Sequence, residues 1–308
     1  MIENKKAYLQ ISFGWLFAII VGITIIFLAI YFVVKVINLE ETAHSAKTSQ
    51  EVGILLNPLE TSFESAVTSS FTFPEETQIH NRCDNYSNFG LQRIEVRQKD
   101  FNKWVETNIE AQFQNKYIFS EKYIQGRTFY IFSKPFKFPF KIADLIYLTP
   151  ASKNYCFVNA PTDIEDELED LNQPNLRIRE GCSEDDILVC FNYGNCDIFV
   201  NYNAKRVEKN NKEVYFEGDA LMYAAIFSDK EIYECQLQRL MKRNLQLSSL
   251  YMNKANYLAI KGCSPVLNPY LAQLINSLSN FENSEELYFL RSLVQEIDNK
   301  NVGKCRLW

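Results

Sequence analysis

The side chains of this chain that most often bind metals or act as nucleophiles are those of its eight cysteines and two histidines. His80 and Cys83 share the segment His80-Asn-Arg-Cys83, which we expect to be a loop. A metal site needs three or four converging donors, and a cysteine nucleophile needs a histidine that a third group orients. The segment offers neither an HxxH nor a CxxC spacing. The sequence therefore predicts a surface histidine beside a disulfide, with no metal and no cofactor.

The cysteines are better explained as a disulfide framework. All eight follow residue 82, and an even set on one side of a membrane span is typical of an oxidising compartment. Cys190 and Cys196 flank a predicted hairpin turn, within the reach of a disulfide. Cys263 and Cys305 are expected to meet at one end of an antiparallel helical unit. The alternative, eight buried thiols in a reducing compartment, stays open at this stage.

No sequence motif of a familiar enzyme class is present. The chain has no GxSxG nucleophile elbow, no HExxH zinc motif and no GxxxxGK[ST] phosphate loop. The acidic run 163–170 lacks the loop glycine of an EF-hand, and first-turn acids are favoured by a helix dipole. Glycosidases work with two carboxylates, so a tethered hydrolase using residues such as Asp144 or Asp219 is an alternative. A non-enzymatic role is the main expectation.

An aromatic residue occupies every second position from Phe136 through Phe138 to Phe140. Lys137 lies between the first two rings, and Lys141 follows the third. On an extended chain the three aromatic rings lie on one face. One interpretation is a strip that docks on a partner protein or on the lipid surface. The other is an edge strand that buries one aromatic face. The net charge of −6 argues against single-stranded nucleic acid as the partner.

A second candidate surface is basic. Arg239, Lys242 and Arg243 lie at helical spacing on the predicted helix 228–261, opposite its apolar face. Such residues usually form a solvated helix face. The alternative is contact with lipid headgroups or with an acidic partner.

A long apolar segment determines where these residues are displayed. Residues 7–34 carry no charge, and a helix needs about 20 apolar residues to cross a bilayer. The sequence predicts a transmembrane helix over 11–37 that contacts lipid. The apolar run is too long for a cleaved signal and ends in no small-residue cleavage site. Lys5 and Lys6 before the span, against Lys35 after it, favour an N-terminus inside the cell and the remaining domain outside.

Lys5-Lys6-Ala7, then Gln10-Ile-Ser-Phe13 and a long apolar helix, resemble the class III signal of archaeal type IV pilins. The resemblance implies cleavage on the cytoplasmic side and packing of the apolar helix in a filament core. Leu9 and Gly14 stand where that pattern usually has a small residue and a glutamate. More broadly, the chain resembles uncharacterised single-pass membrane proteins of small archaeal genomes, a resemblance that implies no activity.

The residues after the span predict an α+β fold. Strands at 155–158 and 176–179 around an acidic helix 162–171 suggest a βαβ unit. Strands at 187–191 and 197–201 read as a hairpin around the turn residues between them. Further strands are expected at 67–73, 91–98, 116–120, 128–132, 142–148 and 214–217.

The last third of the chain predicts three antiparallel helices. Helices at 228–261 and 266–281 and a final helix from Asn283 alternate with short loops. Capping-box spacings mark three helix starts in the chain, at Thr162, Ser228 and Asn283, and Gly262 marks a helix end. The predicted domains are a cytoplasmic N-terminus 1–10, a transmembrane helix 11–37, a helical stalk 38–57 ended by Pro58, a β-rich α+β ectodomain 58–227 and a helical unit 228–308.

The sequence therefore predicts a single-pass membrane protein with its N-terminus in the cytoplasm and a disulfide-stabilised α+β domain outside. Its expected role is structural or interaction-based at the cell surface. The expected partner is another surface or membrane protein, and no oligomeric state is specified. A pilin-like filament subunit processed at its N-terminus and a membrane-tethered carboxylate hydrolase are the alternatives.

Overall fold

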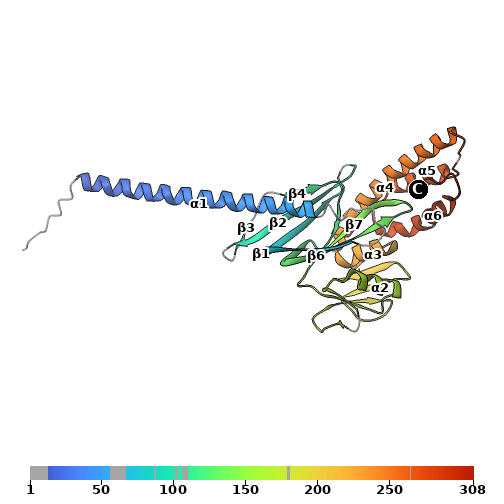
Figure 1. Ribbon diagram of the computed structural model, residues 1–308, viewed down its shortest axis with the longest axis horizontal. Coiled ribbons are helices and arrows are strands. Elements are labelled where there is room, and N and C mark those ends of the chain that lie inside the picture. The colour runs from blue at the N-terminus through green and yellow to red at the C-terminus, as the bar shows by residue number, and fades with distance from the viewer. Residues whose placement is uncertain are drawn as a thin grey trace, which may run out of the picture.

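The computed structural model describes residues 13–55, 67–86, 88–100, 103–105, 110–178, 181–263 and 265–308. It shows a mixed α+β protein in which a long N-terminal helix leads into a domain of two β-sheets and several helices (Figure 1). Residues 1–12, which carry most of the pilin-like pattern, lie outside the described residues, as does Pro58.

Helix α1 (Phe13–Leu55) is continuous over 43 residues. Its part from Gly14 to Lys35 is long and apolar enough to cross a membrane, and the side chains there are not covered by the rest of the chain. A helix that is apolar all round, and not on one stripe, suits a lipid environment. The other end of α1 lies beside strands β2 (Leu91–Asp100) and β4 (Glu110–Phe113) (Figure 1).

The first sheet is built on two long antiparallel strands, β1 (Val67–Asp84) and β6 (Tyr123–Lys137). On one side β2 follows β1 and pairs with both β3 (Lys103–Val105) and β4, while β7 (Lys141–Pro150) and β5 (Tyr117–Phe119) extend the other side. The strand expected at 67–73 therefore continues much further. Pro74 stands where the register of β1 shifts, and this irregularity interrupts the β-pattern of the sequence after residue 73.

The first sheet curls so that its edge strand β5 lies near β1 and β2. Side-chain amides bridge the gap between these strands. Asn81 Nδ2 donates to the Ile118 carbonyl at 3.1 Å, and the Ile118 N–H donates to Gln92 Oε1 at 3.2 Å. Gln236, from helix α4 (Lys230–Ile260), donates to the same Ile118 carbonyl at 3.2 Å. Buried backbone groups must be hydrogen-bonded, so these three amides, here called the polar seam, replace a missing strand. The apolar side chains clustered inside this curl are Phe73, Ile79, Ile94, Val96, Ile118, Ile124, Phe129, Ile131, Ile146 and Leu148.

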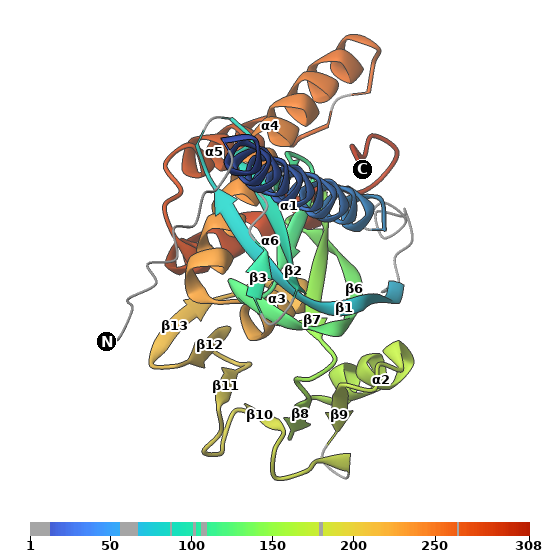
Figure 2. The same ribbon diagram turned by 90° about the vertical axis from the view of Figure 1, so that its left-hand side faces the viewer.

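The second sheet has six strands in the order β13-β12-β11-β10-β8-β9 and lies below the first sheet in Figure 2. Strands β8 and β9 are parallel neighbours, and helix α2 connects them with Ile164, Leu168 and Leu171 buried. The bounds are β8 (Tyr155–Val158), α2 (Thr162–Leu171), β9 (Leu176–Ile178), β10 (Ile187–Phe191), β11 (Ile198–Asn201), β12 (Arg206–Lys209) and β13 (Lys212–Tyr215).

The hairpin expected at 187–201 is wrong, because β10 and β11 are parallel neighbours. The chain must therefore reverse twice between them, and Asn192 and Gly194 adopt positive φ angles of 62° and 126° in that connection. Asp197 Oδ2 accepts the Leu188 N–H at 2.8 Å and holds the loop against β10. The Asn-x-Gly-Asn residues do form a turn, but such a signal does not specify how many chain reversals the turn contains.

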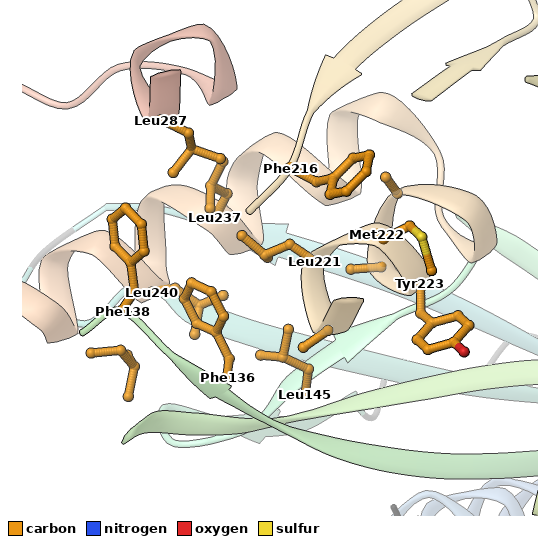
Figure 3. Close-up of a cluster of buried hydrophobic side chains, with 14 of the residues drawn as sticks. Phe136, Phe138, Leu145, Phe216, Leu221, Met222, Tyr223, Leu237, Leu240 and Leu287 are labelled. Carbon is orange, nitrogen blue, oxygen red and sulfur yellow. The ribbon is translucent and has the colours of Figure 1, made fainter. Parts of the chain in front are cut away.

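Helix α3 (Gly218–Phe227) was not predicted. All of its residues from Ala220 to Phe227 are buried, so the segment is apolar on every side and shows no helical period. It packs against β6, β7 and β12. Figure 3 shows Leu221, Met222 and Tyr223 of α3 in the main core, together with Leu237 of α4.

Helix α5 (Asn268–Ser279) contacts both α4 and α6 (Leu287–Lys300), and the short 3₁₀ turn η2 (Ser284–Glu286) precedes α6. Gly262, two residues after the end of α4, has φ +85°, and the Cys263 N–H donates to the Leu258 carbonyl at 2.9 Å. This is the left-handed C-terminal cap that the glycine predicted.

Of the three predicted capping boxes, one forms. Asn283 and Glu286 exchange both hydrogen bonds of the box at η2. Thr162 and Ser228 do not cap: α2 begins after Pro161 and α4 after Asp229, neither with a side-chain cap. Ser228 instead donates to the Ala224 carbonyl of α3, because α3 ends immediately before α4 and offers an acceptor.

All eight cysteines lie in the described residues and all are paired. Cys190 pairs with Cys196 and Cys263 with Cys305, the two pairings expected from the sequence. The other two bonds join elements far apart in the chain. These are Cys83–Cys235, which links β1 to α4 beside the polar seam, and Cys156–Cys182, which links β8 to the segment before β10.

Candidate functional site

The aromatic strip is not a docking surface, which corrects one interpretation of the sequence. Phe136, Phe138 and Phe140 are only 2%, 4% and 1% exposed. The edge-strand interpretation is also wrong, since β6 lies between β1 and β7. Because the β6–β7 turn passes beneath α4, the rings of this segment enter the main core (Figure 3). Phe140 packs against Trp308 at the end of the chain, with ring centroids 5.1 Å apart.

Arg239 does not belong to a solvated basic face. It is fully buried, and its guanidinium lies 4.8 Å from the ring of Tyr117. Its five N–H groups have five acceptors and no carboxylate among them, and burial lowers its pKa to about 10. The acceptors are the carbonyls of Phe89 (3.1 Å), Phe113 (3.3 Å), Gln114 (2.9 Å) and Lys116 (2.9 Å) and Gln236 Oε1 (2.6 Å).

This set of contacts, here called the arginine clamp, ties α4 to the loop that precedes β5. A Cβ on Gly90, which has φ +61°, would come within 2.7 Å of Arg239 Cγ and 2.5 Å of the Asp84 carbonyl oxygen. Only glycine fits there without displacing the clamp. Lys242 extends the connection by donating to the Asn85 carbonyl. The arginine clamp therefore explains two of the three residues of the expected basic patch as structural.

The third residue, Arg243, meets a residue of the former aromatic strip. Arg243 and Lys141 line one pocket of about 320 Å³ between α4 and the start of β7. Asn115 and Asp144 are the other polar residues of this pocket. Its apolar lining consists of Ile142, Ala143 and Leu247.

Two residues of α4 hold the walls of this basic pocket in place. Arg239, one turn before Arg243, binds the carbonyls on both sides of Asn115. Asn244, directly after Arg243, donates from Nδ2 to the Phe138 carbonyl in the β6–β7 turn at 2.7 Å. The loop and the turn are therefore fixed to the same helix, with Arg243 between the two attachments. A pocket built in this way is preorganised.

The charges of the basic pocket do not cancel. Lys141 Nζ lies 2.9 Å from Asp144 Oδ1, so one cation is paired with one carboxylate. Arg243 has no hydrogen bond or ion pair within the described part of the chain, and its guanidinium offers five donors. The pocket is thus locally positive in a protein of net charge −6.

The two carboxylates considered for hydrolysis lie in different clusters. Asp144 pairs with Lys141, while Asp219 accepts the Tyr202 hydroxyl at 3.0 Å and lies 4.0 Å from Lys134 Nζ. Burial and the charge of Asp219 raise the pKa of Tyr202 to about 12. Lys134 also binds Glu167 of α2. These contacts neutralise charge where the two sheets meet.

The histidine of the segment His80-Asn-Arg-Cys83 is packed within the first sheet, with Nδ1 3.8 Å from Glu95 Oε2. His80 lies in β1 and not in a loop, and it is 4% exposed. Its Nε2 is 2.7 Å from Gln78 Oε1, and its ring packs edge-on against Tyr123. Among the described residues, no group of three histidine, cysteine, aspartate or glutamate side chains is arranged to hold a metal ion.

Comparison with known proteins finds no family model that matches the chain, and no similar curated protein or solved structure.

Proposed function

We propose that this protein is a membrane-anchored component of the cell surface that acts by binding another molecule outside the cytoplasm. One observation carries the proposal: an uncovered apolar helix precedes a domain in which every cysteine is bonded. Four disulfides persist in oxidising compartments and are reduced in most cytosols. The domain after α1 is therefore assigned to the outer side, and the residues before α1 to the cytoplasm.

The long first helix supports this arrangement. After Lys35 the helix continues for twenty residues to Leu55. At 1.5 Å per residue this length corresponds to roughly 30 Å. In the proposed arrangement this part of α1 is a stalk that carries the domain beyond the lipid headgroups.

The pairing of the charged groups favours a binding role over a catalytic one. The carboxylates named above are engaged by lysines, while Arg243 faces a preformed pocket. Figure 1 places α4, which carries Arg243, at the end of the molecule far from the start of α1. A ligand or partner that approaches the cell from outside would meet this end first.

Thiol labelling in intact cells tests the placement. A membrane-impermeant maleimide should label none of the eight native cysteines before reduction and should label them after an external reductant is added. An Asn4→Cys variant supplies the control, since its added thiol should react only after the membrane is permeabilised. Native cysteines that react only in permeabilised cells, without a reductant, would place the domain inside and overturn the proposal.

A further inference from the structure

We propose that the basic pocket between α4 and the start of β7 binds a monocarboxylate that carries a short apolar group. This inference deepens the proposed binding role and depends on it. The chemistry is that of a peptide chain end, and a free short-chain carboxylic acid shares it.

The charge of the pocket selects an anion. Arg243 and Lys141 supply two cations, and Asp144 supplies one carboxylate. By contrast, the groove of about 400 Å³ between α5 and α6 contains Glu286 and Glu296 and no cation. The cavity of about 490 Å³ beside the Cys83–Cys235 bond contains more acids than bases, its charged residues being Arg82, Lys122, Asp84, Asp229 and Glu231.

The form of the pocket favours one negative charge over two. Asp144, whose side chain is 11% exposed, remains close to Lys141 and would repel a dianion such as phosphate. A carboxylate carries a single charge, and its planar shape matches the paired donors of the Arg243 guanidinium. Asn115 adds an amide that can donate or accept a hydrogen bond.

The apolar lining determines what can accompany the carboxylate. Of the apolar lining, the side chain of Leu247 is partly exposed, whereas Ile142 and Ala143 are buried. A volume of about 320 Å³ lies at the small end of the range of ligand pockets. A carboxylate attached to a branched aliphatic group of a few carbon atoms satisfies both parts of the pocket. A long polyanion is disfavoured, because the protein as a whole is acidic.

The test uses the full chain in lipid nanodiscs with N-acetylvaline and isobutyrate as probes, followed by ligand-detected NMR. At least one probe should bind saturably, and its neutral amide should not compete. Stronger binding of N-acetylvaline would indicate a peptide end as the source, and stronger binding of isobutyrate a free acid. Arg243→Gln should weaken binding about tenfold, whereas Arg306→Gln, at an exposed arginine outside the pocket, should leave it unchanged.

A second variant keeps the test decisive if Arg243→Gln alters the fold. Asp144→Asn removes the competing carboxylate and should strengthen binding of the carboxylate probe. The inference is overturned if neither probe binds saturably, if Arg243→Gln binds as the wild type does, or if inorganic phosphate displaces the probe at a lower concentration than the probe itself requires. None of these outcomes bears on the thiol-labelling result, so the two proposals can fail separately.

Discussion

Replacing Arg239 with methionine removes the arginine clamp while keeping a side chain of similar length. Five oxygen acceptors lose their donors, and two of them, the Lys116 carbonyl and Gln236 Oε1, are in fully buried hydrogen bonds. An unsatisfied buried acceptor costs roughly 1–3 kcal/mol, so these two cost roughly 2–6 kcal/mol. Removing a desolvated cation returns part of this free energy. We expect a net loss of about 3 kcal/mol in the free energy of unfolding.

Urea unfolding of the full chain in detergent micelles, with all disulfides intact and circular dichroism as the probe, measures this loss. Arg239→Lys should lose nearly as much, because one ammonium group cannot reach acceptors spread around a planar guanidinium. Arg306→Met serves as the control at an exposed arginine and should change stability by less than about 0.5 kcal/mol. A loss below about 1 kcal/mol for Arg239→Met would show that water or a rearranged loop satisfies the acceptors, and the clamp would lose its assigned role.

Two further predictions concern a pair of disulfides and a buried acid. In the chain-entropy model, the Cys83–Cys235 bond closes a loop of 152 residues and adds about 5 kcal/mol to the free energy of unfolding. The Cys190–Cys196 bond closes a loop of 6 residues and adds about 2 kcal/mol. The paired serine variants should therefore differ in thermal midpoint, with the Cys83/Cys235 variant lower, and equal midpoints would contradict the model. Burial raises the pKa of Glu234 above its ordinary value, so the folded state binds the proton more tightly than the unfolded state does. Stability should fall as the pH rises from the ordinary glutamate pKa through the folded value, and Glu234→Gln should reduce this fall in urea midpoints measured across that range.

The parts of the fold that the sequence predicted well are those with a clear period or a local signal. The amphipathic face of α4, the glycine cap at Gly262 and the Asn283–Glu286 box all depend on residues within a few positions of one another. Such signals need no knowledge of what the element packs against. The capping box expected at Ser228 failed for the opposite reason, since an acceptor on the preceding helix α3 took the serine hydroxyl.

The elements that the sequence missed depend on distant partners. Helix α3 lacks a polar side because the first sheet, the second sheet and α4 all cover it. The parallel pairing of β10 and β11 depends on Asp197 and on the loop fold, which no period in the sequence reveals. The burial of Phe138 likewise follows from the position of α4 over the β6–β7 turn, which Asn244 fixes through the Phe138 carbonyl.

The contrast between Arg239 and Arg243 shows why the candidate site could not be read from the sequence. The two arginines are four residues apart, which separates them by one turn along α4 and by about 40° around its axis. That rotation points the first guanidinium at the five acceptor oxygens of the arginine clamp, and the second toward the pocket beside Lys141. Both residues are arginines on the same helix, so neither residue type nor helical position in the sequence distinguishes them. The difference lies in four backbone carbonyls, 123 to 150 positions earlier in the chain, that accept hydrogen bonds from Arg239 and not from Arg243: those of Phe89, Phe113, Gln114 and Lys116. Because the same contacts that bury Arg239 also fix Asn115 in the pocket wall, the structural arginine determines the shape of the site that the other arginine serves.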